Sequence, residues 1–131
     1  MHLTVATSPG EFLDKLTILE IKSERITDPA KRANVVHELA LLRATWAASP
    51  LAGADVASLV AELKAVNETL WDVEDRIRLA ESHARFDDAF IQLARAVYRH
   101  NDERAAIKRR INVALGSTLI EEKSYAEPRP Q

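Results

Sequence analysis

Four stretches of the chain repeat apolar residues at the three- and four-residue spacing that marks one face of an α-helix. The pattern covers approximately residues 9–26, 29–48, 56–83 and 88–115. It is clearest in the third stretch, where the spacing follows a heptad. The apolar row of that stretch contains Val56, Leu59, Leu63, Val66, Leu70, Val73, Ile77 and Ala80. The chain is therefore predicted to be all-α.

The residues between these stretches are typical helix boundaries. Ser8 and Asp28 each precede a proline and are expected to cap the first two helices, because a side-chain oxygen accepts from the free N–H groups of a first turn. Asp55 and Asp87 are expected to cap the third and fourth helices. Gly116 is expected to end the fourth, since glycine tolerates the left-handed conformation that often follows a helix.

Short connections between long amphipathic helices favour antiparallel neighbours. We therefore expect one domain over residues 1–131, folded as an antiparallel up-down four-helix bundle with short extended terminal segments. Leu3 and Val5 alternate like a short strand, and residues 117–131 form the predicted tail. The tail is expected to fray from Glu127 onward, where two prolines follow.

Composition narrows the class of protein. Apolar residues make up 47% of the chain and charged residues 29%, which is typical of a globular domain. The absence of cysteine excludes disulfides, thiolate catalysis and cysteine-ligated metal sites. The net charge of −2 gives no general attraction to nucleic acid or to anionic lipid. With no signal peptide and no apolar run of membrane-spanning length in the pattern, we expect a cytoplasmic protein without a membrane partner.

The fourth helix carries polar residues in the row where apolar ones are expected. Asn101, Lys108 and Asn112 share the face that should point at the other helices. Glu74 on the third helix and Glu20 on the first lie close to the apolar rows of their own helices. The candidate layer, with two further residues at its edge, contains Glu20, Asn67, Glu74, Arg78, Asn101, Lys108 and Asn112.

Two interpretations of this layer stay open. In the first it is a structural network, in which Glu74 or Glu20 pairs with a buried Lys108, because an unpaired lysine in a core would lose its proton. In the second it lines a pocket for a small anionic ligand, since sites in helical bundles are built from inward side chains.

No metal or cofactor is expected. Carboxylate-bridged di-metal bundles need Glu-x-x-His on two helices, and the sequence has no such pair. The Glu-x-x-Glu and Glu-x-x-Asp pattern by which all-α nucleotide pyrophosphohydrolases hold Mg²⁺ lacks its first half here, although Glu11 and Asp14 have the spacing of the second. The residue types of Glu74, Arg78, Asn101 and Lys108 suit a helical chorismate mutase, but their order matches no such enzyme.

The basic residues of the fourth helix are the best candidates for binding phosphate or nucleic acid. Asp102 and Glu103 interrupt them and few aromatic residues lie between them, so we do not expect a nucleic-acid partner. The basic residues are Arg99, Arg104, Lys108, Arg109 and Arg110.

Ile18 and Ile21 lie on the side of the first helix away from its main apolar row, and Leu41 lies similarly on the second. A helix that is apolar on two faces needs two partners. We therefore predict a homodimer whose candidate interface contains these three residues.

Four segments in order resemble an uncharacterised family of short bacterial proteins, a domain of unknown function. They are EFLDKLTILEIKSERI, LWDVEDRIR, FDDAFIQLARAVYRHNDERAAIKRRIN and GSTLIEEKSY. The resemblance covers nearly the whole chain, implies no reaction, and leaves enzymatic activity undecided. The first functional hypothesis is a non-enzymatic interaction or accessory protein that dimerises and contacts a protein partner. The alternative is an enzyme or small-anion-binding protein that uses the polar layer.

Overall fold

The computed structural model describes residues 1–127, and these form four helices and no strand. The helices are α1 (Pro9–Arg25), α2 (Pro29–Ala47), α3 (Ala57–Ser82) and α4 (Asp88–Ala114). Each helix begins and ends within one residue of the predicted bounds. The prediction of an all-α fold is confirmed.

Three of the four predicted helix caps are present. The side chains of Ser8, Asp28 and Asp87 accept from the backbone N–H groups three residues further on, at 3.1, 2.9 and 3.2 Å. The prediction for Asp55 was wrong. Helix α3 begins at Ala57, one residue later than predicted, and no side chain caps its first turn. Gly116 has φ +64°, and the next N–H donates to the carbonyl of Asn112 at 2.9 Å, which closes the end of α4.

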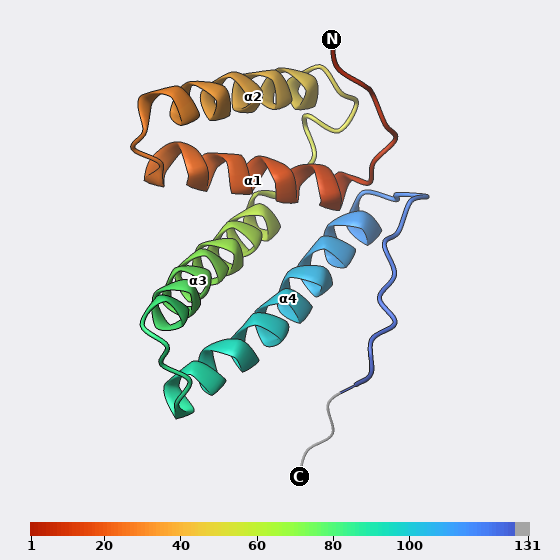
Figure 1. Ribbon diagram of the computed structural model, residues 1–131. Coiled ribbons are helices and arrows are strands. Elements are labelled where there is room, and N and C mark those ends of the chain that lie inside the picture. Colours follow the sequence, from red (N-terminus) through yellow and green to blue (C-terminus); the bar gives the residue numbers. More distant parts are fainter. Residues whose placement is uncertain (128–131) are drawn as a thin grey trace.

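The helices form two antiparallel hairpins that cross each other (Figure 1). α1 pairs with α2, α3 pairs with α4, and α1 lies across both helices of the second hairpin near its open end. The α2 backbone approaches α1 but neither α3 nor α4. The up-down bundle that we expected is therefore not confirmed, and α1 is the central helix.

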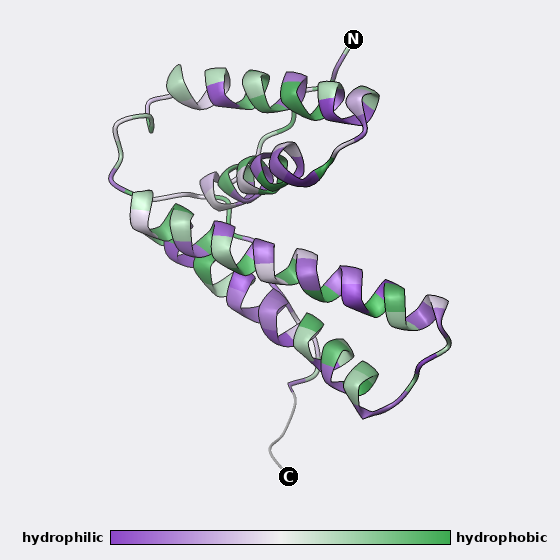
Figure 2. Ribbon diagram, turned by 90° about the vertical axis from the view of Figure 1, so that its left-hand side faces the viewer, coloured by the Kyte–Doolittle hydropathy of each residue, from purple (hydrophilic) through white to green (hydrophobic). Residues whose placement is uncertain are grey.

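The hydrophobic core lies at this crossing. Figure 2 shows α1 between α2 and the second hairpin, whose far end extends beyond it. Phe12 of α1 stacks on Trp46 of α2, with 5.9 Å between ring centroids. The core cluster contains Leu13, Leu16, Leu19, Leu39, Val56, Leu63, Val66, Ile107 and Ile111.

The central position of α1 explains why it is apolar on two faces. Ile21 is buried within the single chain, and Ile18 is half-buried beside it. Both line a groove of about 480 Å³ with Leu70 and Trp71 of α3. Leu41 of α2 is exposed. The second face of α1 is therefore turned toward the α3–α4 hairpin of the same chain.

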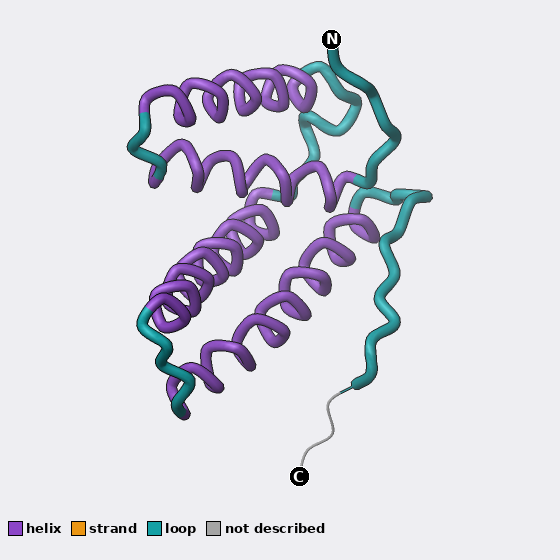
Figure 3. Tube along the Cα trace, viewed as in Figure 1, coloured by secondary structure: helices purple, strands orange, loops and turns teal. Residues whose placement is uncertain are grey.

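The segments outside the helices are loops (Figure 3). Leu3 and Val5 are exposed and belong to no strand. Residues 117–127 leave α4 and run back beside it without helix or strand. Of the predicted frayed tail, only Glu127 falls within the described residues. Among those residues, no helix is both long and apolar enough to cross a membrane.

Candidate functional site

A buried ion pair joins α1 to α4 where the two hairpins cross. The Asp14 side chain is 2% exposed and accepts two hydrogen bonds from the Arg104 guanidinium, one of them from Nε at 2.8 Å and the other from Nη2. Asn67 of α3 donates from Nδ2 to Asp14 at 2.9 Å and to the Thr17 hydroxyl at 3.1 Å. Asn101 accepts a longer bond, 3.5 Å, from the same guanidinium. One carboxylate thus links three helices.

Lys108 lies one turn further along α4, between two carboxylates. Its side chain is 9% exposed, and its Nζ donates at 2.6 Å to Glu11 of α1 and at 2.6 Å to Glu121. Glu121 belongs to the segment after α4, so the ammonium joins α4, the first turn of α1 and that segment. Since one carboxylate would neutralise Lys108, the second one serves to hold the segment in place.

The first turn of α1 touches the α4 backbone at Gly10. Its N–H donates to Asn112 Oδ1 at 2.7 Å. A Cβ at this position would lie 2.5 Å from the Lys108 carbonyl oxygen, closer than real Cβ contacts. Only glycine therefore fits here without a shift of the backbone.

The ion pairs favour the charged forms of Lys108, Arg104 and Glu121. Burial lowers the pKa of Lys108, but its hydrogen bonds to Glu11 and Glu121 outweigh that effect, so the pKa is raised. The hydrogen bond to Asp14 raises the pKa of Arg104. The hydrogen bond from Lys108 is the main reason why the pKa of Glu121 lies below its ordinary value of 4.5.

The structure brings together only part of the predicted layer. Asn67, Asn101 and Lys108 belong to the connected polar groups just described, and Asn112 is buried next to them. The other three residues lie elsewhere. Glu20 pairs with Lys64 at 3.5 Å, whereas Glu74 pairs with Arg78 of its own helix in solvent-exposed positions. Lys108 is buried as expected, but neither Glu20 nor Glu74 is its partner.

Sequence reasoning singled out Glu11, Asp14 and Arg104 for other reasons, but it did not place them, or Glu121, in the polar network at the crossing of the hairpins. Glu11 and Asp14 are three residues apart, and Arg104 and Lys108 are four apart. Both spacings correspond to about one turn of helix. Two acids one turn apart on one helix and two bases one turn apart on another were a signal for two parallel ion pairs.

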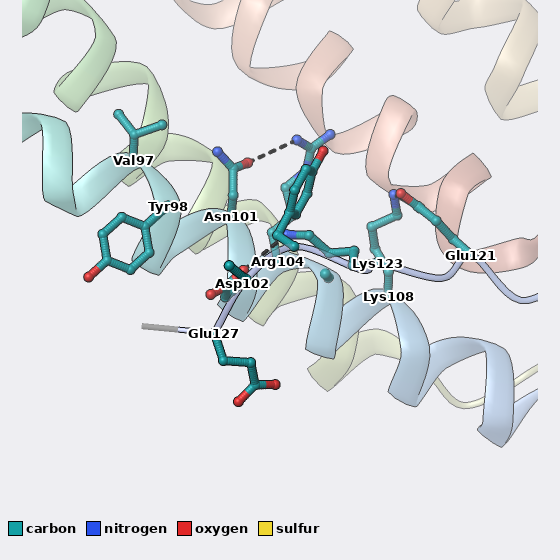
Figure 4. A pocket seen from close by; sticks show the side chains of 12 residues that line it. Val97, Tyr98, Asn101, Asp102, Arg104, Lys108, Glu121, Lys123 and Glu127 are labelled. Carbon is teal, nitrogen blue, oxygen red and sulfur yellow. Dashed lines mark hydrogen bonds and ion pairs between the residues drawn. The ribbon is translucent and has the colours of Figure 1, made fainter. Parts of the chain in front are cut away.

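A pocket of about 650 Å³ opens between α4 and the segment that follows it (Figure 4). Asn101, Arg104 and Lys108 form part of the α4 wall, and Tyr98 lies further along it. Residues 121–127 contribute the opposite wall, where the Lys123 ammonium lies 5.5 Å from the centroid of the Tyr125 ring. The pocket therefore reaches the network from outside.

Within residues 1–127 the buried polar groups of the network satisfy one another. Every buried side-chain nitrogen or oxygen has a hydrogen-bond partner. No group of three or more acidic, histidine or cysteine side chains is arranged to hold a metal ion in this part of the chain. Chemically, the arrangement can hold segments together by charge.

Carboxylates also neutralise most of the basic row on α4. Besides the pairs of Arg104 and Lys108, Arg109 pairs with Glu122 at 3.3 Å and Arg110 with Glu62 at 3.1 Å. These ion pairs weaken the attraction that such a row would exert on phosphate groups.

Comparison with known proteins places the chain in a family. No curated protein and no solved structure matches it. Residues 3–130, nearly the whole chain, match a family of unknown function, DUF6165. This agrees with the resemblance to an uncharacterised domain family, and the chain belongs to the DUF6165 family.

Proposed function

We propose that the protein is a non-enzymatic interaction protein that forms a homodimer through the outer half of its α3–α4 hairpin, residues 74–99. The observation that carries this proposal is burial: none of these residues is buried in the single chain. Helices that project from a core are marginal in water unless their apolar face packs against something. A partner on this face would supply that packing.

The outer half of the hairpin exposes large apolar side chains. Leu79, Phe86, Ile91 and Tyr98 are 39–59% exposed, and α1 and α2 lie at the other end of the hairpin (Figures 1 and 2). Phe86 and Phe90 meet edge to face at the tip, with 5.3 Å between ring centroids. Apolar side chains gathered on one projecting element are typical of protein interfaces.

The charges of the outer half favour a second copy as the partner. Asp75 lies on α3 about two turns from the hairpin loop, next to Glu74, which already pairs with Arg78 of the same helix. Arg95 and Arg99 lie on α4 about two and three turns from the hairpin loop. When two hairpins pack about a two-fold axis, α3 of one copy can face α4 of the other, so Asp75 of each copy can meet Arg95 or Arg99 of the other.

The closed polar network favours an interaction role over catalysis. Its cations are paired within the chain, and its buried polar atoms need no ligand to satisfy them. The alternative, an enzyme or small-anion-binding protein, is supported by the pocket of about 650 Å³ beside Lys108 and Arg104. Thermal stabilisation by inorganic phosphate at constant ionic strength, lost in Lys108→Met, would favour that alternative.

Light scattering coupled to size exclusion tests the dimer. Wild type is expected to be a dimer, and Phe86→Glu and Ile91→Glu are expected to be monomers, because each places a charge on the proposed interface. Leu41→Glu is the matched control, since Leu41 is nearly as exposed as Ile91 but lies on α2. If Leu41→Glu alone dissociates the dimer, the interface lies on α1 and α2, as the sequence predicted. A wild type that is monomeric at high micromolar concentration overturns the proposal.

A further inference from the structure

The segment after α4 is held along that helix by three ion pairs. Glu121 pairs with Lys108 at 2.6 Å, and Glu122 pairs with Arg109 at 3.3 Å. Lys123 pairs with Asp102, which lies nearer the start of α4, at 3.0 Å. The segment therefore runs antiparallel to α4, with two adjacent carboxylates against two adjacent cations.

Apolar burial contributes little to this contact. Leu119, Ile120 and Tyr125 remain 46, 40 and 81% exposed, and the pocket of about 650 Å³ lies between the segment and α4. Except for Lys108 and Lys123, the paired groups are more than half exposed, and such pairs typically stabilise by only about 0–1 kcal/mol each. The segment matches α4 in charge but does not fill the space beneath it.

We propose that this surface of α4 is a docking groove for an extended acidic segment of a partner protein, and that residues 119–125 occupy it as an internal ligand. The recognition elements are Lys108 and Arg109 for two consecutive carboxylates, and the unfilled pocket for the side chains that follow. A partner that packs into the pocket gains contacts that the internal segment lacks. The groove overlaps the proposed dimer interface only at its edge, where Val97 and Tyr98 line it.

The internal segment competes with a partner because it is tethered. A tethered ligand acts at an effective concentration of roughly millimolar order when its linker is short. Reversing the charges of the segment should release it and free the groove. Glu121 and Glu122 are both more than half exposed, so Glu121→Lys and Glu122→Lys can be combined without disturbing the core.

The experiment measures binding of a labelled synthetic peptide, TLIEEKSYAE, to the full chain by fluorescence anisotropy. The Glu121→Lys, Glu122→Lys protein is expected to bind it about tenfold or more tightly than wild type does, since release removes the tethered competitor. Adding Arg109→Glu should abolish the gain. Arg109 is used rather than the buried Lys108 because it is exposed, so its replacement should leave the fold intact.

Two controls decide what the groove recognises. The same peptide with lysine in place of the two adjacent glutamates, which correspond to Glu121 and Glu122, should not bind the released protein. Equal affinity of wild type and the released protein for the acidic peptide, or equal affinity of the released protein for both peptides, overturns the proposal. Thermal stabilisation of the released protein by inorganic phosphate without peptide binding also overturns it and assigns the groove to a small anion.

Discussion

Arg104 reaches from α4 to Asp14 of α1 and donates two hydrogen bonds to a carboxylate that is almost completely buried. This pair fixes how the two hairpins cross, because it is formed only when the first turns of α1 lie against the last turns of α4. The neighbouring pair of Lys108 and Glu11 repeats the arrangement one turn further on.

Removing Arg104 should destabilise the protein more than removing Asp14. Arg104→Met leaves a carboxylate buried without its cation, which typically costs about 3–5 kcal/mol in the free energy of unfolding. Asp14→Asn should cost less, because the Arg104 guanidinium is 29% exposed and can reach water. Denaturant midpoints of both variants and of the double variant give the coupling energy.

The matched control is Lys15→Met, which removes a solvent-exposed pair with Glu38 on the other side of α1. It should change stability by less than about 1 kcal/mol. Equal costs for Arg104→Met and Lys15→Met would mean that the buried pair does not hold the hairpins together.

Gly10→Ala should destabilise the protein, although alanine is the better helix former by about 1 kcal/mol. The added methyl group would lie 2.5 Å from a backbone oxygen of α4 and 2.9 Å from the amide oxygen of Asn112. Overpacking of this kind costs about 1–3 kcal/mol. Gly53→Ala is the control, because a Cβ at Gly53 meets nothing within 4 Å. Thermal melts of both variants check the prediction, and a more stable Gly10→Ala protein would contradict it.

The helix bounds could be predicted from the sequence because the signals are local. Ser8, Asp28, Asp87 and Gly116 act on the backbone within a few residues of their own position, whatever the rest of the chain does. The wrong prediction of a cap at Asp55 also has a local cause. Helix α3 begins two residues after Asp55, so the Asp55 side chain makes no hydrogen bond to the first turn.

The site could be predicted only in part because its partners depend on how the hairpins cross. Periodicity placed Lys108 in the interior, and it is buried. An up-down bundle would have set Glu20 or Glu74 opposite it, whereas the observed crossing brings Glu11 there instead. Glu121 lies in a segment without helical periodicity, so no pattern could align it with Lys108.

Ala84→Gly should stabilise the protein. Ala84 follows the end of α3 with φ +52°, a left-handed conformation that costs a residue with a Cβ about 1–2 kcal/mol. Glycine avoids this cost but loses about 0.4–1 kcal/mol through the greater freedom of the unfolded chain. The net gain should be about 0.5–1 kcal/mol, seen as a higher denaturant midpoint. Ala52→Gly, in a loop position without positive φ, should instead lower it.

Acid should release the segment after α4. The pKa of Glu121 lies below its ordinary value of 4.5 in the folded protein, because the hydrogen bond from Lys108 favours its carboxylate more than burial opposes it. A group with a lowered pKa stabilises the docked state fully above its ordinary pKa and loses that effect as the pH falls through the lowered one. The segment should therefore stay docked from neutral pH down to about 4.5 and detach below it.

A fluorophore on Ser124→Cys can follow this release, since the chain has no other cysteine. Its anisotropy should remain constant above about pH 4.5 and fall below it, while circular dichroism at each pH separates release of the segment from unfolding of the helices. With Glu121→Gln, anisotropy should already be lower at neutral pH and should change less on acidification, because the titrating group and its ion pair with Lys108 are gone. A wild-type transition near pH 6.5, the ordinary range of histidine, would instead assign the release to a histidine. Unchanged anisotropy in Glu121→Gln would show that Glu122 and Lys123 hold the segment without Glu121.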